Sequence, residues 1–465
     1  MLLPLNPSPA LEAARAIAAT LTNAGHPAYF AGGCVRDLLL GHPAKDFDVA
    51  TSATPDQIIA LFPRTLQVGA HFGVILVVQQ IGDVDVTTEV ATFRHDGVYL
   101  DGRRPDAVRF TTDPREDVLR RDFTINGMLL NPAKIVASQV DDTAVLDFVG
   151  GRADLAAAII RIIGPAELRF TEDKLRMLRG VRFAARLGFT IEPQTMRAIQ
   201  HHAPEIAQVS CERIREELTR MLTQGHARRA FELLDQSGLL AQVLPEITRM
   251  HGVEQPPEYH PEGDVFVHTM LLLEHLPAGT SPTLAWGMLL HDVGKPATFQ
   301  PPNPAKPGDR IRFNGHVEVG VRIAEEILRR LRFSTGDSAQ ILSLVRHHMQ
   351  FGDIKSMKQS THKRFLRLPS FDEHLALHRA DCLSAHRDLS LYDFAKDAYE
   401  TTEPDQVSPP LLVTGRDLIA AGYRPGPPFK AMLEAAEDAQ LEGRIATTEE
   451  GLALIQGEFP SGKPK

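Results

Sequence analysis

Residues 30–50 have the sequence FAGGCVRDLLLGHPAKDFDVA, which joins a glycine pair, an arginine and two alternating aspartates. We expect a short apolar strand that ends at Ala31, a turn at Gly32-Gly33 and a helix over residues 35–40. The backbone N–H groups at the start of this helix, together with the Arg36 guanidinium, would bind an anion such as a phosphate. The stretch therefore predicts a phosphate-binding turn beside a metal site.

The two aspartates lie in the next expected strand, residues 45–50. Side chains alternate along a strand, so Asp46 and Asp48 should share one face while Phe47 and Val49 enter the core. Carboxylates at this spacing suit Mg²⁺, which prefers carboxylate oxygens and substrate phosphates. Two such ions could activate an attacking hydroxyl and neutralise a leaving pyrophosphate. The alternative is an exposed DxD edge without a ligand, and the adjoining glycine turn favours the metal site.

Length and composition set the protein class. A chain of 465 residues is too long for one ordinary core and predicts two to four domains. Its 43% hydrophobic and 23% charged residues are typical of a soluble globular protein. The sequence contains no long apolar run, so no membrane-spanning helix is expected. The N-terminus lacks a signal-peptide pattern and the three cysteines form no CxxC pair, which indicates a cytoplasmic protein. The net charge of −9 argues against general nucleic-acid binding, and no DNA partner is expected.

Two further strands are expected after the aspartates, over residues 71–80 and 83–93. In the second strand, valines alternate with polar residues, so the valines should face the core. These valines are Val84, Val86 and Val90. Glu89 lies on the polar face and becomes a candidate third acid of the metal site. Its alternative role is that of a solvated strand residue.

The chain then changes from strand to helix. Residues 94–109 are polar and glycine-rich and should form a mobile loop. Residues 116–130 contain VLRRDFTINGMLL, which predicts a helix start with two arginines and an aspartate before an apolar run. Strand character ends near Gly150, and residues 154–250 are helical throughout.

Residues 171–187, TEDKLRMLRGVRFAARL, predict a helix with Thr171 as its N-cap and an acidic first turn. Its arginines recur at three- and four-residue steps and form one stripe with Asp173 at its head. These arginines are Arg176, Arg179, Arg182 and Arg186. A solvated, salt-bridged face is the usual meaning of such a stripe. Four arginines against two acids, however, leave positive charge for an anion.

A proline-rich break at residues 251–261 precedes apolar helical segments that carry histidines and aspartates. In chain order these are His268, His291, Asp292, His316, His347, His348 and Asp381. A lone histidine on a helix is usually a core residue, but this set, with its adjacent His-Asp pair, is difficult to explain by packing. Imidazole and carboxylate ligands suit a transition metal, or Mg or Mn, that activates water.

Five motifs occur in order over about residues 25–250: GGCVRD, KDFDVAT, RRPD, RRDFTIN and EDKLRMLRGVRFAARLGF. Together they resemble the bacterial tRNA nucleotidyltransferase and poly(A) polymerase family, the class II branch of the polymerase-β-like nucleotidyltransferases. The remainder resembles an HD metal-dependent phosphohydrolase domain, which is fused to some CCA-adding enzymes. The resemblance implies an α+β protein with a mixed-sheet head followed by helical domains. The expected domains are a nucleotidyltransferase head (1–150), an all-α neck and body (151–250), an all-α HD domain (251–395) and a helical tail (396–465).

The resemblance also implies roles for the residues that match the head motifs. Gly33 and Arg36 would hold the phosphates of an incoming nucleotide. Asp46 and Asp48 would bind Mg²⁺, with Glu89 in the place of the third carboxylate.

Two later motifs would bind the rest of the nucleotide. Arg121 and Asp122 would contact the ribose and allow selection of its 2′-hydroxyl. The neck helix would recognise the base and triphosphate through Asp173, Arg176, Arg179 and Arg182. Cytosine and adenine each present an amino donor beside a ring-nitrogen acceptor, so the acceptor–donor pair Asp173 and Arg176 matches both bases. Guanine and uracil present the reverse order and would leave buried groups unpaired.

In the HD domain, four residues match the metal-ligand pattern: His268, His291, Asp292 and Asp381. His316 and either His347 or His348 would complete a second metal or contact the substrate. The resemblance does not specify this divalent metal, which could be Mg, Mn, Ni or Fe.

The motifs together predict an enzyme that rebuilds the 3′-CCA end of tRNA from CTP and ATP. The HD domain would add a phosphatase or phosphodiesterase activity. The nearest alternative is a poly(A) polymerase or A-adding tRNA enzyme of the same family. A regulatory HD phosphohydrolase with a nucleotide-sensing head is a further alternative, and the sequence predicts no oligomeric state.

Overall fold

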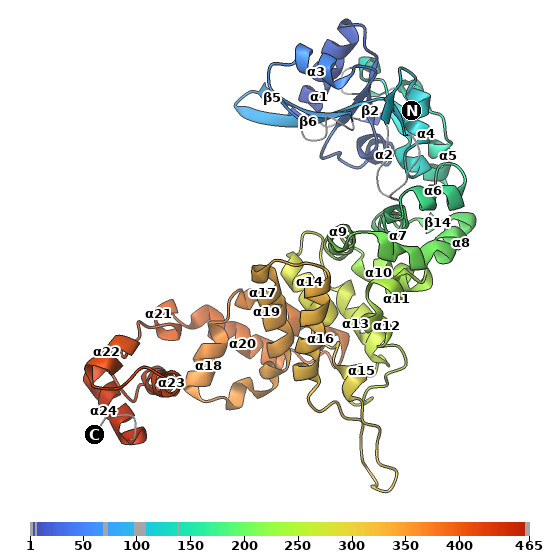
Figure 1. Ribbon diagram of the computed structural model, residues 1–465. Helices are drawn as coiled ribbons and strands as arrows, with labels where there is room; N and C mark the ends of the chain where they lie inside the picture. Colours follow the sequence, from blue (N-terminus) through green and yellow to red (C-terminus); the bar gives the residue numbers. More distant parts are fainter. Residues whose placement is uncertain are drawn as a thin grey trace. The chain divides into compact units, whose positions relative to one another are not determined.

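In the computed structural model the chain divides into two compact units, residues 1–245 and 246–465 (Figure 1). The structure describes residues 3–4, 7–67, 73–96, 108–136, 139–140 and 142–460. Across these ranges, none of the helices combines the length and apolar character needed to cross a lipid bilayer.

The core of the first unit is a mixed seven-stranded sheet with the order β12-β9-β2-β3-β6-β5-β4. β3 and β6 pair in parallel, and all other neighbours in this sheet are antiparallel. The strands are β2 (Ala28–Ala31), β3 (Asp48–Thr51), β4 (Thr65–Leu66), β5 (Val74–Ile81), β6 (Val84–Thr92), β9 (Met128–Leu130) and β12 (Val145–Asp147). A mixed sheet followed by helical domains confirms the predicted fold class.

Helices beside the sheet fix the position of the glycine turn. α1 (Pro9–Asn23) packs on four of the strands and buries Ile17 and Leu21 completely. α2 (Gly33–Leu39) follows Gly32, whose φ of 75° is a conformation that glycine adopts readily. The remaining head helices are α3 (Pro55–Leu61), α4 (Pro114–Leu119), α5 (Gly151–Ala156) and the 3-10 turns η2 (Thr124–Asn126), η3 (Pro132–Lys134) and η4 (Asp142–Ala144).

Three smaller sheets lie outside the main sheet in the described part of the chain. Their strands are β1 (Leu3–Pro4), β10 (Ile135–Val136), β11 (Gln139–Val140), β7 (Arg94–Asp96), β8 (Val108–Phe110), β13 (Ile159–Ile160) and β14 (Thr190–Ile191). The expected loop over residues 94–109 therefore has paired strands at both ends. Its middle, including the RRPD motif, and the first residues of the strand expected over 71–80 lie outside the described residues.

Three local predictions for the head are wrong. β3 begins at Asp48, so Asp46 precedes the strand, although Phe47 and Val49 are buried as expected. Val84 is 56% exposed because it lies at the turn of the β5–β6 hairpin, beyond the covered part of the sheet. The helix expected within residues 116–130 ends at Leu119, before the arginine pair, and the chain continues through η2 into β9.

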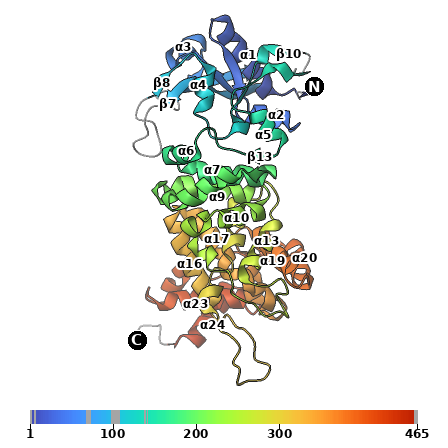
Figure 2. The ribbon, with the colours of Figure 1, turned by 90° about the vertical axis from the view of Figure 1, so that its right-hand side faces the viewer.

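Six helices complete the first unit: α6 (Ala166–Glu172), α7 (Leu175–Leu187), α8 (Pro193–His202), α9 (Cys211–Thr223), α10 (Ala227–Gln236) and α11 (Leu239–Val243). η5 (Ala203–Gln208) joins α8 to α9. The arginine helix, α7, packs against α9 and α10 (Figures 1 and 2). The prediction that Thr171 caps this helix is wrong, because Thr171 lies in α6 and its hydroxyl donates to the Glu167 carbonyl. Asp173 separates the two helices and accepts a hydrogen bond from the Leu175 N–H at 3.1 Å.

Among the described residues of the second unit, the regular elements are helices, and two isolated β-bridges lie in the segments between them. Its helices are α13 (Val265–Glu274), α14 (Pro282–Leu290), α15 (Lys295–Thr298), α16 (His316–Arg330), α17 (Thr335–His347), α18 (Gln359–Leu366), α19 (Phe371–Ser384), α20 (Ser390–Thr401), α21 (Pro404–Val407), α22 (Gly415–Ala420), α23 (Pro428–Leu441) and α24 (Thr448–Glu458). α12 (Pro245–Thr248) lies at the division between the units, and η6 (His348–Ser356) follows α17. α14 packs on α13, α17 and α19, so the ends of these helices surround the His291-Asp292 pair. The last helices, α22 to α24, form a separate small core.

Candidate functional site

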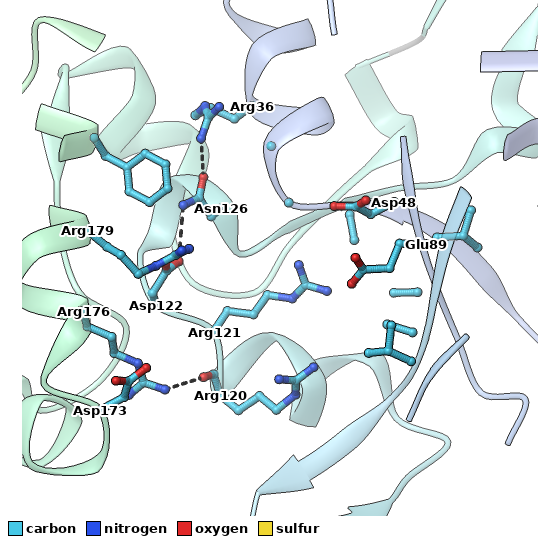
Figure 3. Close-up of a pocket in the computed structure, with 18 of the residues that line it drawn as sticks. Arg36, Asp48, Glu89, Arg120, Arg121, Asp122, Asn126, Asp173, Arg176 and Arg179 are labelled. Atoms are coloured by element: carbon cyan, nitrogen blue, oxygen red, sulfur yellow. Dashed lines mark hydrogen bonds and ion pairs between the residues drawn. The ribbon is translucent and has the colours of Figure 1, made fainter. Parts of the chain in front are cut away.

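A pocket of about 650 Å³ opens in the first unit between the sheet, the η2 turn and α7 (Figure 3). Its polar lining contains seven arginines and four carboxylates. The arginines are Arg36, Arg94, Arg120, Arg121, Arg176, Arg179 and Arg186; the acids are Asp48, Glu89, Asp122 and Asp173. The excess of positive charge suits a polyanionic ligand.

Carboxylates converge at the sheet end of this pocket. Asp48 and Glu89 both line it, from β3 and β6, and Asp46 lies close enough to affect the ionisation of Asp48. Desolvation and the nearby Glu89 raise the pKa of Asp48 to about 6, against the opposing effect of Arg121. A carboxylate whose pKa is raised beside other acids is suited to a divalent cation, which would favour its ionised form.

Asp122 and Arg179 form an ion pair at the other side of the pocket (Figure 3). Arg179 donates to the Asp122 Oδ2 atom from Nε at 2.9 Å and from Nη2 at 2.6 Å. Burial alone would raise the pKa of Asp122, but Arg179 lowers it to about 2. Asp122 is therefore ionised near pH 7 and can accept hydrogen bonds inside the pocket.

Two of the predicted phosphate-binding residues occupy different environments. Gly33 lines the pocket at the start of α2. Arg36 is 3% exposed and is held by Asp37 at 2.6 and 2.8 Å and by Asn126 at 2.7 Å. Arg36 thus has its guanidinium engaged by protein groups, although it contributes to the pocket wall.

The predicted base-reading pair lies side by side at the end of the pocket near α7 (Figure 3). Arg176 donates to the Arg120 carbonyl at 3.1 Å and to Glu172 at 2.8 Å. Asp173 accepts from Arg213 at 3.3 Å. These contacts fix both side chains before any ligand binds.

Arg182 does not line the pocket. It points to α9 and pairs with Glu217 at 2.6 Å, with both side chains buried. The stripe on α7 therefore serves two purposes, since Arg179 lines the pocket while Arg182 attaches the helix to its neighbour.

Several pocket residues were not predicted from the sequence. Phe183 has three guanidiniums over its ring, those of Arg36, Arg179 and Arg182, at 4.4 to 5.5 Å from its centroid. Asn126 connects Arg36 to Asp122. The TIN segment of RRDFTIN, directly after the arginine pair, was the available signal for Asn126. Nothing local marks Phe183.

A second pocket, also of about 650 Å³, lies in the second unit beside the His291-Asp292 pair. Two groups of candidate metal ligands meet there, each with its ligand atoms within 4.8 Å of one another. One group is His268, His291 and Asp381, and the other is Asp292, His316 and His348. The structure thus brings together all four residues of the predicted ligand pattern and two of the three additional histidines.

Asp292 lies between the two groups. Its Oδ2 atom is 3.1 Å from the His291 Nε2 atom and 3.9 Å from that of His268. Its Oδ1 atom is 3.8 Å from the Nε2 atoms of both His316 and His348. One carboxylate therefore faces both groups, as a bridging ligand between two cations would.

The ring orientations fit metal coordination. His291, His316 and His348 each place Nδ1 within 2.7 to 3.0 Å of the carbonyl three residues earlier in the chain. This bond holds the proton on Nδ1 and leaves Nε2 as a lone-pair donor. The buried Nε2 atoms of His268 and His291 each face a carboxylate, with Asp381 Oδ1 at 3.0 Å from the first and Asp292 Oδ2 at 3.1 Å from the second. Imidazole nitrogens in this state match the requirements of a cation site.

Other charged residues hold this centre, and the sequence did not single them out. Glu262 accepts from the His268 Nδ1 at 2.7 Å, and Lys295 donates to Asp292 at 2.7 Å. Burial alone would raise the pKa of Asp292, but His291 and Lys295 hold it well below its usual range. A lysine four residues after the histidine of the His-Asp pair, in HDVGK, was the available signal.

The structure also distinguishes the adjacent histidines. His348 is 3% exposed and its Nε2 atom lies 3.4 Å from that of His316. The His347 ring instead lies beside His374, with the two ring centroids 6.0 Å apart. His348 is therefore the member of the pair that joins the candidate metal centre.

Known protein families match the chain over three segments. The Poly A polymerase head domain matches residues 28–161, the "probable RNA and SrmB-binding site of polymerase A" matches residues 188–250, and the HD domain matches residues 263–386. A CCA-adding enzyme of Levilactobacillus brevis is 31% identical over 454 residues, which is 97% of this chain and 96% of that protein. The chain belongs to the CCA-adding enzyme family. This confirms the resemblance stated from the motifs.

Two further matches describe how far the likeness extends. The CCA-adding enzyme of Geobacillus stearothermophilus is 42% identical over 233 residues, which is 50% of this chain and 54% of that protein. The chain thus spans about half the length of this relative in the aligned segment. The crystal structure of the Bacillus stearothermophilus CCA-adding enzyme in complex with CTP has a TM-score of 0.72 and 25% identity, over 98% of this chain and 99% of that one.

Proposed function

We propose that the first unit adds CMP and AMP to the 3′ end of tRNA, with CTP and ATP as substrates. The observation that carries this proposal is the pocket that combines a carboxylate cluster at one end with an acceptor–donor pair at the other. A relative described as a CCA-adding enzyme in complex with CTP supports the choice of nucleotide. Three free cysteines, two of them buried, support a cytoplasmic location.

In this proposal Asp46 and Asp48 hold Mg²⁺, with Glu89 beside them. Magnesium, when bound there, supplies activation of the tRNA 3′-hydroxyl and charge neutralisation at the leaving pyrophosphate. The carboxylate crowding that raises the pKa of Asp48 supports the fit of a cation. Arg121 and the other pocket arginines orient the triphosphate through charge-assisted hydrogen bonds.

The nucleoside is selected by fixed acceptors and donors. Asp122, ionised and held by Arg179, accepts from the ribose 2′-hydroxyl. Asp173 accepts from the exocyclic amino group of cytosine or adenine, and Arg176 donates to the adjacent ring nitrogen. Because protein contacts hold both side chains in place, they could not turn to match the reversed donor and acceptor of guanine or uracil. Arg36 and Arg182 act indirectly, because their hydrogen bonds to other elements hold α2 and α7 in place.

We further propose that the second unit is a metal-dependent phosphohydrolase. His268, His291, Asp292 and Asp381 would hold one divalent cation, and His316 and His348, on the other side of Asp292, would hold a second. The cations, when bound, supply a water of lowered pKa as nucleophile. Lys295, Arg310 and Arg312 line the same pocket and suit a phosphate ester.

The nucleotidyl transfer is tested with a tRNA transcript that lacks its last three nucleotides. Two additions with CTP alone and a stop at three with CTP and ATP would support CCA addition. A ladder with ATP and no product with CTP would instead assign the protein to the adenylating relatives. Asp46→Ala and Asp48→Ala should each abolish incorporation, whereas Asp56→Ala, an exposed aspartate outside the pocket, should not. Full activity in either of the first two variants would refute the head mechanism.

The hydrolase is tested separately with p-nitrophenyl phosphate and bis-p-nitrophenyl phosphate in the presence of Mn²⁺ or Ni²⁺. His291→Ala and Asp292→Ala should remove the activity and leave CMP incorporation intact. His275→Ala is the matched control, since His275 is exposed at the end of α13. Equal hydrolysis by the wild type and His291→Ala would refute this second proposal.

A further inference from the structure

Asn126 connects two charged groups that come from different parts of the first unit (Figure 3). Its Oδ1 atom accepts a hydrogen bond from the Arg36 Nη1 atom at 2.7 Å. Its Nδ2 atom donates to the Asp122 Oδ1 atom at 3.3 Å. Asn126 is 7% exposed, so water cannot readily replace either partner.

The chemistry of the partners fixes the orientation of the amide. A guanidinium can only donate and an ionised carboxylate can only accept, so Oδ1 must face Arg36 and Nδ2 must face Asp122. No other short side chain offers an acceptor and a donor side by side in this way. An alanine would leave both partners unsatisfied, and an aspartate would satisfy Arg36 but repel Asp122.

The hydrogen-bonded chain continues at both ends. Arg36 is held by Asp37 within α2 at 2.6 Å, and Asp122 is held by Arg179 of α7 at 2.6 Å. The series Asp37–Arg36–Asn126–Asp122–Arg179 thus joins the glycine-turn helix to the arginine helix across the pocket wall. Asn126 is its only uncharged member.

We infer that Asn126 is a positioning residue for nucleotide selection, because it sets the orientation of the Asp122 carboxylate. The inference deepens the proposed function, on which it rests, since Asp122 there accepts from the ribose 2′-hydroxyl. Asp122 Oδ1 also accepts from the Phe123 N–H at 2.8 Å, and Oδ2 accepts from Arg179. Together with these donors, the Asn126 amide holds the carboxylate against rotation about its Cβ–Cγ bond.

Asn126→Asp keeps a partner for Arg36, removes the donor to Asp122 and places a second carboxylate beside it, so it disturbs the Asp122 end of the chain and not the Arg36 end. The assay measures incorporation of CMP and dCMP into tRNA that lacks its CCA end, at varied CTP and dCTP. We expect the KM for CTP to rise about tenfold and the CTP-to-dCTP ratio of kcat/KM to fall about tenfold, with kcat changed less. A merely structural role would lower the active fraction, and hence kcat, without moving either KM or the ratio.

Asn131→Ala is the matched control. Asn131 lies five residues further along, outside the pocket, and its side chain accepts from the Ala133 N–H at the start of η3. It should retain the wild-type KM and ratio. Asn126→Ala, which also removes the donor, carries the same test if the aspartate variant does not fold by circular dichroism.

The outcomes separate the inference from the function on which it rests. A wild-type protein that adds no CMP would overturn the proposed function and the inference together. A wild type that uses dCTP as well as CTP would remove the role of Asp122 and overturn the inference. A discriminating wild type whose Asn126→Asp variant keeps the same KM and ratio would overturn the inference alone.

Discussion

Gly294→Ala should disrupt the candidate metal centre of the second unit, although the glycine is not one of its ligands. Gly294 follows the His291-Asp292 pair and lies against the first turns of α16. A Cβ atom at this position would lie 2.6 Å from the Gly320 backbone nitrogen and closer still to the His316 carbonyl oxygen. Both obstacles are backbone atoms, which no side-chain rotation can move.

The size of the effect follows from these distances. Ordinary carbon contacts begin at about 3.4 Å, so α16 must withdraw by roughly 0.8 Å or more from Gly294. His316 is the first residue of α16 and its Nε2 atom is 3.8 Å from Asp292, so the gap between two ligands would widen by a similar amount. Misplacements of about 1 Å impair metal sites, and we expect the affinity for Mn²⁺ to fall roughly 10- to 100-fold.

The measurement is a calorimetric titration of metal-free protein with Mn²⁺, in an Asp46→Ala and Asp48→Ala background that silences the first unit. Gly336→Ala is the matched control, since the nearest atom to its added Cβ lies at 4.0 Å. Its affinity should equal that of the parent. The reasoning is refuted if Gly294→Ala folds normally and binds Mn²⁺ within about threefold of the parent.

Three other predictions concern stability. Fluorescence of the single tryptophan, Trp286, follows unfolding of the second unit, and circular dichroism follows unfolding of both units. Glu217→Ala should cost about 3–5 kcal/mol because it leaves the Arg182 charge buried and unpaired, and adding Arg182→Met should recover much of the loss in urea unfolding. Burial lowers the pKa of His374 to about 4. The buried neutral imidazole therefore costs no stability above pH 6.5, whereas the unfolded chain gains a proton at this residue, and folding becomes less favourable, as the pH falls towards 4. The second unit should lose about 3 kcal/mol over that range, and His374→Leu should lose less; equal slopes would contradict this. Gly151→Ala should destabilise the first unit by roughly 1–3 kcal/mol, because its Cβ would overlap the Thr124 carbonyl; an unchanged dichroism transition would count against this.

Local periodicity predicted most of the regular elements. The helix α2 and the strands β5 and β6 follow from apolar spacing and turn residues alone, and the structure has them within a few residues of the expected bounds. The ends of these elements are determined by residues that are close in the sequence, so the sequence alone predicts them. The glycine pair predicted its turn in the same way.

Features that depend on distant partners could not be predicted in this way. The RRDF segment follows the end of α4, and the Arg120 and Arg121 carbonyls accept from Arg169, 49 and 48 residues away. Arg182 has the same spacing as the pocket arginines, and only the position of Glu217 on α9 explains its separate direction. His347 and His348 are equivalent in sequence pattern, and the end of α17 determines which of them meets Asp292.

Three of the metal-centre histidines take their orientation from the carbonyl three residues earlier, within their own chain segment. The direction of each ring is therefore set within its own segment of the chain, whereas the spacing between the rings is set by how the helix ends pack. These two properties can change independently. Core substitutions beneath the helix ends could thus alter the size of the cation that fits, without changing the ligands or the orientation of their rings.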